Sequence, residues 1–209
     1  MTLRYDDVLP DLRASYDGAA QERDGLTKQQ FKLDERAAFL DRLQVAEARS
    51  LLEIGAGTGQ DSVFFRDAGL DVTAVDLSPE MVRKCQDKGL SAAVRDVQNL
   101  KFPDESFDAV YTLNCLLHVP NADLPEALSA IRAVLRPGGL IFVGLWGGES
   151  AEGVLAEDQH EPKRFFSFRS DEELLGHLSR SFEVLDFHTV GSGRHYFQST
   201  TLVRPLVLD

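Results

Sequence analysis

Short apolar runs alternate with segments whose apolar residues recur at helical spacing, and this alternation begins near residue 50. Apolar runs bounded by turn-forming residues predict buried strands. We expect these strands at 50–57, 70–78, 90–97, 106–114 and 140–146. Helical periodicity predicts the intervening helices at 61–69, 78–89 and 123–139. Ser78, followed by Pro79, is a good N-cap for the second of these helices.

The order of strand, helix and strand implies parallel strands joined by right-handed crossovers. A further helix is expected at 170–180, where Ser170 and Glu173 have the spacing of a capping box. The last two strands, 181–190 and 195–205, are joined by a glycine-containing connection that suits an antiparallel hairpin. The predicted fold class is therefore α/β. It is a Rossmann-like, doubly wound sheet of seven strands, mostly parallel with an antiparallel last strand, and with helices on both faces.

Two regions lie outside this alternation. Residues 1–46 are rich in charge and have helical periodicity, with Phe39 and Leu43 on one face, which predicts two or three helices. Residues 147–169 have no clear period and predict a loop long enough to have a functional role. We therefore divide the chain into an N-terminal helical region, 1–46, and a main domain, 47–209.

The composition is that of an ordinary globular protein, with a strong negative charge. The chain has 209 residues and a formal net charge of −12, so its surface repels phosphate backbones and no nucleic-acid partner is expected. The N-terminus lacks an apolar signal core, and no apolar run approaches the length of a membrane span. The two cysteines, Cys85 and Cys115, suit neither a disulfide scaffold nor a metal site. These features predict a cytoplasmic protein without membrane contact, and they leave its oligomeric state open.

A glycine turn follows the first predicted strand, with Gly55, Gly57 and Gly59 in alternate positions. Glycine lets the backbone approach a ligand closely and adopt dihedral angles that a side chain forbids. The pattern departs from the dinucleotide fingerprint, because Gln60 stands where glycine or alanine is expected. Asp61 also places a negative charge where a pyrophosphate would bind. The turn therefore favours a zwitterionic or cationic ligand over a nicotinamide dinucleotide.

The segment LLEIGAGTG resembles the first motif of class I methyltransferases that use S-adenosylmethionine. The resemblance extends over about residues 48–145 and is strongest to the branch of the superfamily that acts on small molecules. It implies S-adenosylmethionine as cofactor, S-adenosylhomocysteine as product and a small-molecule acceptor as partner. It also implies that the N-terminal helices form a lid over the cofactor and that 147–169 lies on the acceptor side.

Carboxylates at two predicted strand ends suit an adenosyl group. Asp76 ends the second strand, where a carboxylate can accept hydrogen bonds from a ribose diol. The resemblance implies that Asp96, after the third strand, accepts from the adenine amine while Val97 donates a backbone N–H to the ring. It further implies that Leu77 and Met81 pack against the adenine.

The resemblance implies that the methionine part of the cofactor lies against the first and fourth strands. Leu113 and Asn114 would flank it, Glu53 would orient the turn or bind the ammonium through water, and Tyr16 would close over the cofactor. The predicted cofactor-binding residues are Glu53, Gly55, Ala56, Gly57, Gly59, Asp76, Leu77, Met81, Asp96, Val97, Leu113, Asn114 and Tyr16.

Methyl transfer from a sulfonium is an in-line displacement, so the protein mainly positions the acceptor and excludes water. A base is needed only where the acceptor atom must lose a proton. Of the five histidines, His118 is the best placed, just after the fourth strand. We name His118 as the candidate catalytic residue and expect no metal.

Three alternatives remain open from the sequence. A protein that binds the cofactor without transferring a methyl group would share the same motif. A protein or tRNA methyltransferase is disfavoured by the acidic charge. A nicotinamide-dependent oxidoreductase is disfavoured by the glycine spacing.

Overall fold

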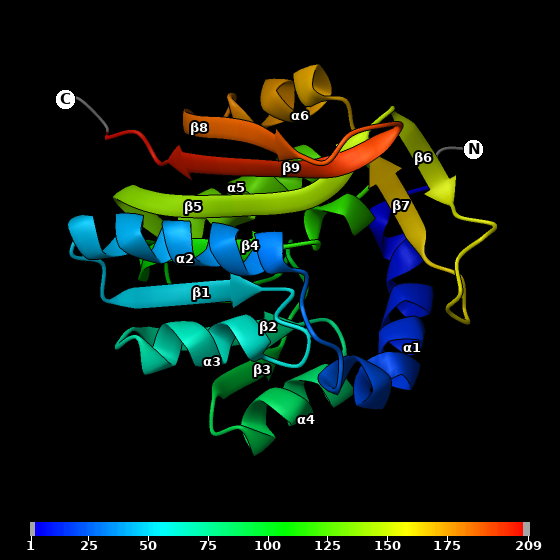
Figure 1. Cartoon of the computed structure of the whole chain (residues 1–209), viewed down its shortest axis with the longest axis horizontal. Helices are drawn as coiled ribbons and strands as arrows, with labels where there is room; N and C mark the ends of the chain where they lie inside the picture. Colours follow the sequence, from blue (N-terminus) through cyan, green and yellow to red (C-terminus); the bar gives the residue numbers. More distant parts are fainter. Residues whose placement is uncertain (1–2, 207–209) are drawn as a thin grey trace.

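The computed structural model describes residues 3–206 and has a seven-stranded sheet at its centre (Figure 1). The strands lie in the order β3-β2-β1-β4-β5-β9-β8, and only β9 runs antiparallel to its neighbours. Their bounds are β1 Ser50–Ile54, β2 Asp71–Asp76, β3 Ser91–Val94, β4 Phe107–Leu113, β5 Leu135–Gly148, β8 Glu183–Val190 and β9 His195–Val203. The predicted fold class is confirmed, including the hairpin of β8 and β9 at the end of the chain.

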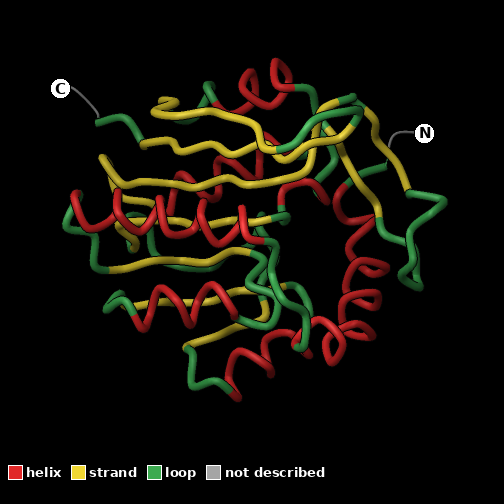
Figure 2. Tube along the Cα trace, in the orientation of Figure 1, coloured by secondary structure: helices red, strands yellow, loops and turns green. Residues whose placement is uncertain are grey.

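Helices cover both faces of the sheet, as the tube in Figure 2 shows. Their bounds are α1 Tyr5–Asp24, α2 Gln30–Val45, α3 Gln60–Asp67, α4 Pro79–Asp87, α5 Leu124–Val134 and α6 Asp171–Leu178, with a short 3₁₀ helix η1 at Leu116–His118. Two of the predicted caps are confirmed. Ser78 accepts a hydrogen bond from the backbone N–H of Met81 at 3.1 Å, and Ser170 with Glu173 forms a capping box.

The sheet divides the core into two apolar layers, one on each face, because successive strand residues point to opposite sides. Leu51, Tyr111 and Phe142 point to the layer that contains α2 and α3. Their neighbours Leu52 and Val110 point to the layer that contains α1, α5 and α6. Both faces of the strands are therefore buried, which explains why these strands read as continuous apolar runs rather than as alternating ones.

The N-terminal region forms two helices with different surroundings. In α2, Phe39 and Leu43 are almost wholly buried against the sheet, so this helix belongs to the core. In contrast, α1 stands at the edge of the sheet beside α4 and faces the carboxyl ends of the strands (Figure 1). Only α1 and its connection to α2 are therefore placed as a lid would be.

The region 147–169 differs from the predicted loop. It contains a two-stranded antiparallel sheet of β6, Ala151–Val154, and β7, Phe165–Phe168. A second difference concerns β5, which begins at Leu135, whereas the sequence predicts a helix as far as residue 139 and a strand from residue 140. The helix α5 ends earlier, at Val134, because Leu135 already pairs with Phe107 of β4.

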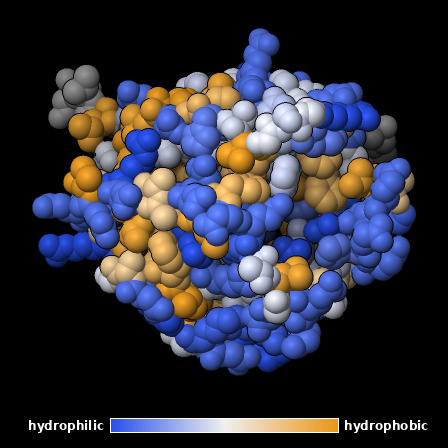
Figure 3. All heavy atoms as spheres, in the orientation of Figure 1, coloured by the Kyte–Doolittle hydropathy of each residue, from blue (hydrophilic) through white to orange (hydrophobic). Residues whose placement is uncertain are grey.

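The surface in the orientation of Figure 1 is largely hydrophilic, in keeping with the high content of charged residues (Figure 3). Among the described residues, no helix is both long enough and apolar enough to cross a membrane.

Candidate active site

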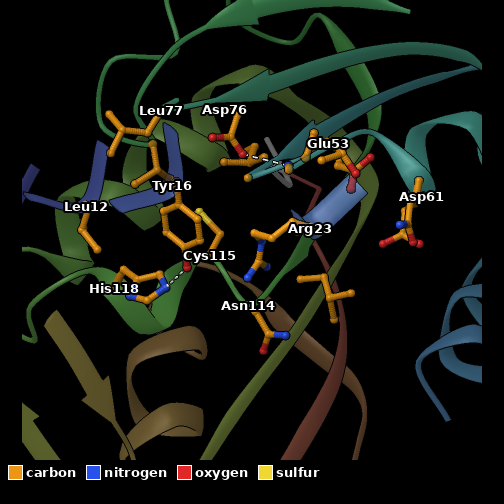
Figure 4. Close-up of a pocket in the computed structure, with 18 of the residues that line it drawn as sticks. Leu12, Tyr16, Arg23, Glu53, Asp61, Asp76, Leu77, Asn114, Cys115 and His118 are labelled. Atoms are coloured by element: carbon orange, nitrogen blue, oxygen red, sulfur yellow. Dashed lines mark hydrogen bonds between the residues drawn. The ribbon is translucent and has the colours of Figure 1, made fainter. Parts of the chain in front are cut away.

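A cavity of about 440 Å³ lies at the carboxyl ends of β1, β2 and β4, between these strand ends and α1 (Figure 4). Its volume is in the range of sites for small molecules and cofactors. Twelve of the predicted site residues line it, namely Tyr16, Glu53, Gly55, Ala56, Gly57, Asp76, Leu77, Asp96, Val97, Leu113, Asn114 and His118. Residues from several strands, helices and connections are thus brought together, as expected where parallel strands end at one edge of a sheet.

The glycine turn has the backbone conformation that its sequence indicated. Gly55 and Gly57 have φ values of +74° and +56°, which side chains rarely adopt. A Cβ at Gly55 would lie 2.7 Å from the Cβ of Cys115, so this glycine allows close packing against the end of β4. A Cβ at Gly57 would meet no atom within 4 Å. Gly57 therefore faces open space in the cavity wall, where a ligand can approach the backbone.

Asp76 is held in place by the turn. Its carboxylate accepts hydrogen bonds from the backbone N–H of Gly57 at 2.8 Å and of Ser78 at 2.9 Å. Burial raises the pKa of Asp76, and these two N–H groups oppose that effect. Since an ionised carboxylate has about four acceptor positions, Asp76 keeps capacity for hydroxyl donors from the cavity.

Asp96 follows β3 and is oriented by its own loop. Its Oδ1 accepts from the backbone N–H groups of Gln98 and Asn99, both at 3.0 Å. Val97, the neighbouring residue, is buried and lines the cavity. These contacts fix one end of the cavity.

Glu53 lies on β1 and is almost wholly buried. Its carboxyl group accepts a hydrogen bond from the hydroxyl of Ser62 on α3. Burial, and then the nearby Asp61 carboxylate, raise the pKa of Glu53 to about 8. The free protein therefore holds Glu53 largely neutral at pH 7, and a positive charge placed beside it would favour ionisation.

Two predicted cofactor residues, Gly59 and Met81, do not line the cavity. A Cβ at Gly59 would lie 2.7 Å from Leu90 and 2.9 Å from the sulfur of Cys85, so Gly59 allows α3 to pack closely on α4. Met81 is fully buried beneath the N-cap of α4. Both have packing roles here, because the cavity ends at Leu77 on this side.

Asn114 has an unusual backbone and an unpartnered side chain. Its φ is +55°, and its N–H donates to the carbonyl of Gly144 at 2.7 Å. Its Oδ1 is buried and has no hydrogen-bond partner among the described residues. Since Asn114 lines the cavity, a donor on a bound ligand would satisfy this oxygen.

The candidate catalytic residue His118 belongs to a hydrogen-bonded chain. Its Nδ1 lies 2.7 Å from the backbone carbonyl of Phe165, and its Nε2 lies 2.6 Å from the hydroxyl of Tyr16. A carbonyl only accepts, so Nδ1 carries the proton and Nε2 accepts from Tyr16. Burial lowers the pKa of His118 to about 3, which agrees with a neutral ring.

Tyr16 and His118 both line the cavity, and the hydrogen bond between them is the dashed line beside His118 in Figure 4. The Tyr16 oxygen also accepts a hydrogen bond at 3.1 Å from the guanidinium of Arg164. Arg164 is itself held by Asp158 through contacts at 2.9 and 2.7 Å. This contact links the segment between β6 and β7 to the site, on the side that sequence reasoning assigned to the acceptor.

Sequence reasoning missed the basic residues around the connection from α1 to α2. Arg23, Lys28 and Lys32 all line the cavity. Asp61 of α3, which the sequence placed beside the glycine turn, is buried and pairs with Lys28 of the connection and, at 2.7 Å, with Arg36 of α2. No local sequence pattern indicates these pairs, because their members are more than twenty residues apart.

Comparison with known proteins finds a similar domain and similar folds. Residues 51–139 match the family model described as a methyltransferase domain. The malonyl-[acyl-carrier protein] O-methyltransferase of Pseudescherichia vulneris is 34% identical over 144 residues, covering 66% of this chain and 55% of that protein. A ubiquinone biosynthesis O-methyltransferase of Xanthomonas oryzae pv. oryzae is 35% identical over 122 residues, covering 55% and 50%. The chain therefore spans about half the length of these relatives.

Solved structures share the whole architecture. The 1,6-didemethyltoxoflavin-N1-methyltransferase of Burkholderia thailandensis, solved with 1,6-didemethyltoxoflavin and S-adenosylhomocysteine, has a TM-score of 0.78 at 23% identity. The match covers 98% of this chain and 92% of that one. The complex of DhpI with S-adenosylhomocysteine has a TM-score of 0.68 at 24% identity and covers 95% and 97%. Residues 51–139 thus match a methyltransferase domain, and the chain has the fold of these two solved structures.

Proposed function

We propose that this protein transfers a methyl group from S-adenosylmethionine to a small-molecule acceptor. The observation that carries the proposal is the convergence of the glycine turn, Asp76 and Asp96 on one cavity. The groups on its wall fit the cofactor. Gly57 leaves open space beside its backbone, Asp76 keeps free acceptor positions, and the buried Oδ1 of Asn114 has no partner among the described residues.

In this proposal, each group of the cofactor has a matching residue. Asp76 binds the ribose hydroxyls, and Asp96 with Val97 binds the adenine beside Leu77. Glu53 and the Oδ1 of Asn114 receive the ammonium, which satisfies the buried oxygen and favours the ionised form of Glu53. When bound, the cofactor supplies an activated methyl group, so the remaining task of the chain is to position the acceptor and exclude water.

In this proposal, Tyr16 and the residues hydrogen-bonded to it form the part of the cavity where the methyl acceptor binds. His118 is neutral, and both of its ring nitrogens are engaged, so we assign it a positioning role. It holds the Tyr16 hydroxyl, with Arg164, at the cavity wall. The helix α1 with its connection to α2 acts as the lid in this proposal, while 47–209 forms the methyltransferase domain.

The proposal is tested by incubating the protein with S-adenosylmethionine labelled in the methyl group and a small-molecule extract. We expect label in a small molecule, dependent on the protein and lost in an Asp76→Ala variant. A thermal-shift comparison separates the cofactor classes, with stabilisation by S-adenosylhomocysteine and none by NAD. Stabilisation by NAD alone would contradict the proposal, and cofactor binding without transfer to any acceptor would favour a non-catalytic binding protein.

A further inference from the structure

Three basic side chains from one short segment line the cavity of this acidic protein. Arg23 lies near the end of α1, Lys28 lies in the connection, and Lys32 lies in the first turn of α2. In the view of Figure 4, the Arg23 side chain extends into the space between Tyr16 and Asn114. The segment therefore places positive charge where the chain as a whole, at −12, is strongly negative.

Only one of the three is neutralised by the protein. Lys28 forms an ion pair with the buried Asp61. Within residues 3–206, no carboxylate lies within 4 Å of Arg23 or of Lys32. Their contacts are with aromatic rings instead. The guanidinium carbon of Arg23 is 5.2 Å from the ring centre of Tyr16, and the Nζ of Lys32 is 5.5 Å from that of Trp146.

These cations are close enough to repel one another. Burial, and then the positive charges of Lys28 and Arg23, lower the pKa of Lys32. The carboxylates of Asp61 and Asp76 offset these charges without forming ion pairs with Lys32 or Arg23, and an anion held by the two cations would offset them directly. The arrangement is costly for the protein alone, which indicates that a negatively charged ligand occupies this part of the cavity.

The cofactor accounts for only part of this charge. S-adenosylmethionine carries a single carboxylate, together with a positive ammonium and a positive sulfonium. If that carboxylate meets one cation, the other still faces a sulfonium of like charge. Elsewhere the cavity wall has apolar side chains at Leu12 and Leu26.

Building on the function proposed above, we propose that the methyl acceptor is an anionic small molecule with an apolar body. Its carboxylate or phosphate group is held by Arg23 and Lys32, and its apolar body lies against Leu12, Leu26 and the ring of Tyr16. The anion cancels the repulsion between the two cations and places the acceptor over the sulfonium. A positively charged acceptor is rejected by the same residues.

The test uses 4-hydroxybenzoate and phenyl phosphate as anionic probes, with 4-hydroxybenzamide as the neutral match. Each probe is titrated by calorimetry into the full chain saturated with S-adenosylhomocysteine. We expect the anionic probes to bind at least about tenfold more tightly than the amide. The Lys32→Met variant should lose this preference, whereas Lys101→Met, which removes an exposed lysine outside the cavity, should keep it.

Separate titrations with S-adenosylhomocysteine and 5′-methylthioadenosine keep this inference distinct from the proposed function. Methylthioadenosine lacks the amino-acid carboxylate. One outcome is that Arg23→Met and Lys32→Met weaken the binding of S-adenosylhomocysteine but not of methylthioadenosine, while the anionic probes bind no more tightly than the amide. Both cations would then serve the cofactor, and the inference would be overturned. Equal probe binding in Lys32→Met and wild type would also overturn it. Failure of the wild type to bind S-adenosylhomocysteine would instead overturn the proposed function itself.

Discussion

At the scale of single residues, we expect the carboxyl group of Glu53 to lose its proton when the proposed cofactor binds. Its pKa is raised by burial to about 8, so at pH 7 the free protein holds a proton that a bound ammonium would displace. We predict that binding of S-adenosylhomocysteine at pH 7 releases up to about one proton. The release is measured by calorimetry in buffers of different ionisation enthalpy. Glu53→Gln should abolish it, and a release that survives in this variant would contradict the assignment.

The same group affects stability with a defined sign. The unfolded chain loses the Glu53 proton near its ordinary pKa of 4.5, whereas the folded chain keeps it to about pH 8. The contribution of Glu53 to the free energy of unfolding is therefore full below pH 4.5 and declines as the pH rises through this window. Compared with the wild type, Glu53→Gln should thus show a smaller loss of stability between pH 5 and pH 8.

His118 offers a second test at this scale. We predict a neutral ring, protonated at Nδ1, down to about pH 5, because burial lowers the pKa of His118 to about 3. Nitrogen chemical shifts of the imidazole rings measure both the tautomer and the titration. His188 is the internal control, since hydrogen bonds to Glu35 and Asp186 raise its pKa above the ordinary value. Titration of His118 near pH 6.5 would contradict the lowered pKa, and a neutral ring protonated at Nε2 would contradict the tautomer.

At the scale of elements, Arg169 joins β7 to the segment that carries His118. It is fully buried, and its guanidinium donates to Asn121 at 2.7 Å and to the carbonyls of Val119 at 2.6 Å and Leu116 at 3.2 Å. The single ammonium group of a lysine cannot make the hydrogen bonds that the three guanidinium nitrogens make here. We predict that Arg169→Lys lowers the free energy of unfolding by about 2–4 kcal/mol.

Urea denaturation measures this change, and Arg83→Lys on the exposed face of α4 is the matched control. Arg83 pairs only with Glu80 and Asp87 at the surface, so its replacement should alter stability by less than about 1 kcal/mol. Equal effects of the two substitutions would show that the buried arginine does not hold η1 and β7 together.

The elements that sequence patterning missed are those formed by distant contacts. The strands β1, β2 and β4 follow from their apolar runs, because both of their faces are buried. The strand β6 has no such signal, because three of its four residues are exposed. Its residue Glu152 accepts hydrogen bonds from Ser167 of β7 at 2.9 Å and, outside the pair, from the N–H of Asn121 at 2.7 Å.

At the scale of the whole molecule, the strand ends of the site and Tyr16 on the opposite wall could be predicted, whereas the basic side chains of that wall could not. Asp76 and Asp96 were found because the order of strands fixes which residues meet at one edge of the sheet. Arg23 and Lys32 reach the same cavity through the docking of α1 and α2, which depends on the full tertiary packing. The composition does not indicate these two residues either, because a net charge of −12 gives no sign of a basic cavity wall.

The central claim is that this cavity binds the adenosyl cofactor, with Asp76 on the ribose. The most direct measurement is a calorimetric titration of the full chain with S-adenosylhomocysteine, repeated with Asp76→Ala. We predict saturable binding at one site per chain, and a loss of at least about tenfold in affinity for the variant, since it removes hydrogen bonds to a charged acceptor. No binding by the folded wild type, or equal affinity in the variant, would contradict the account.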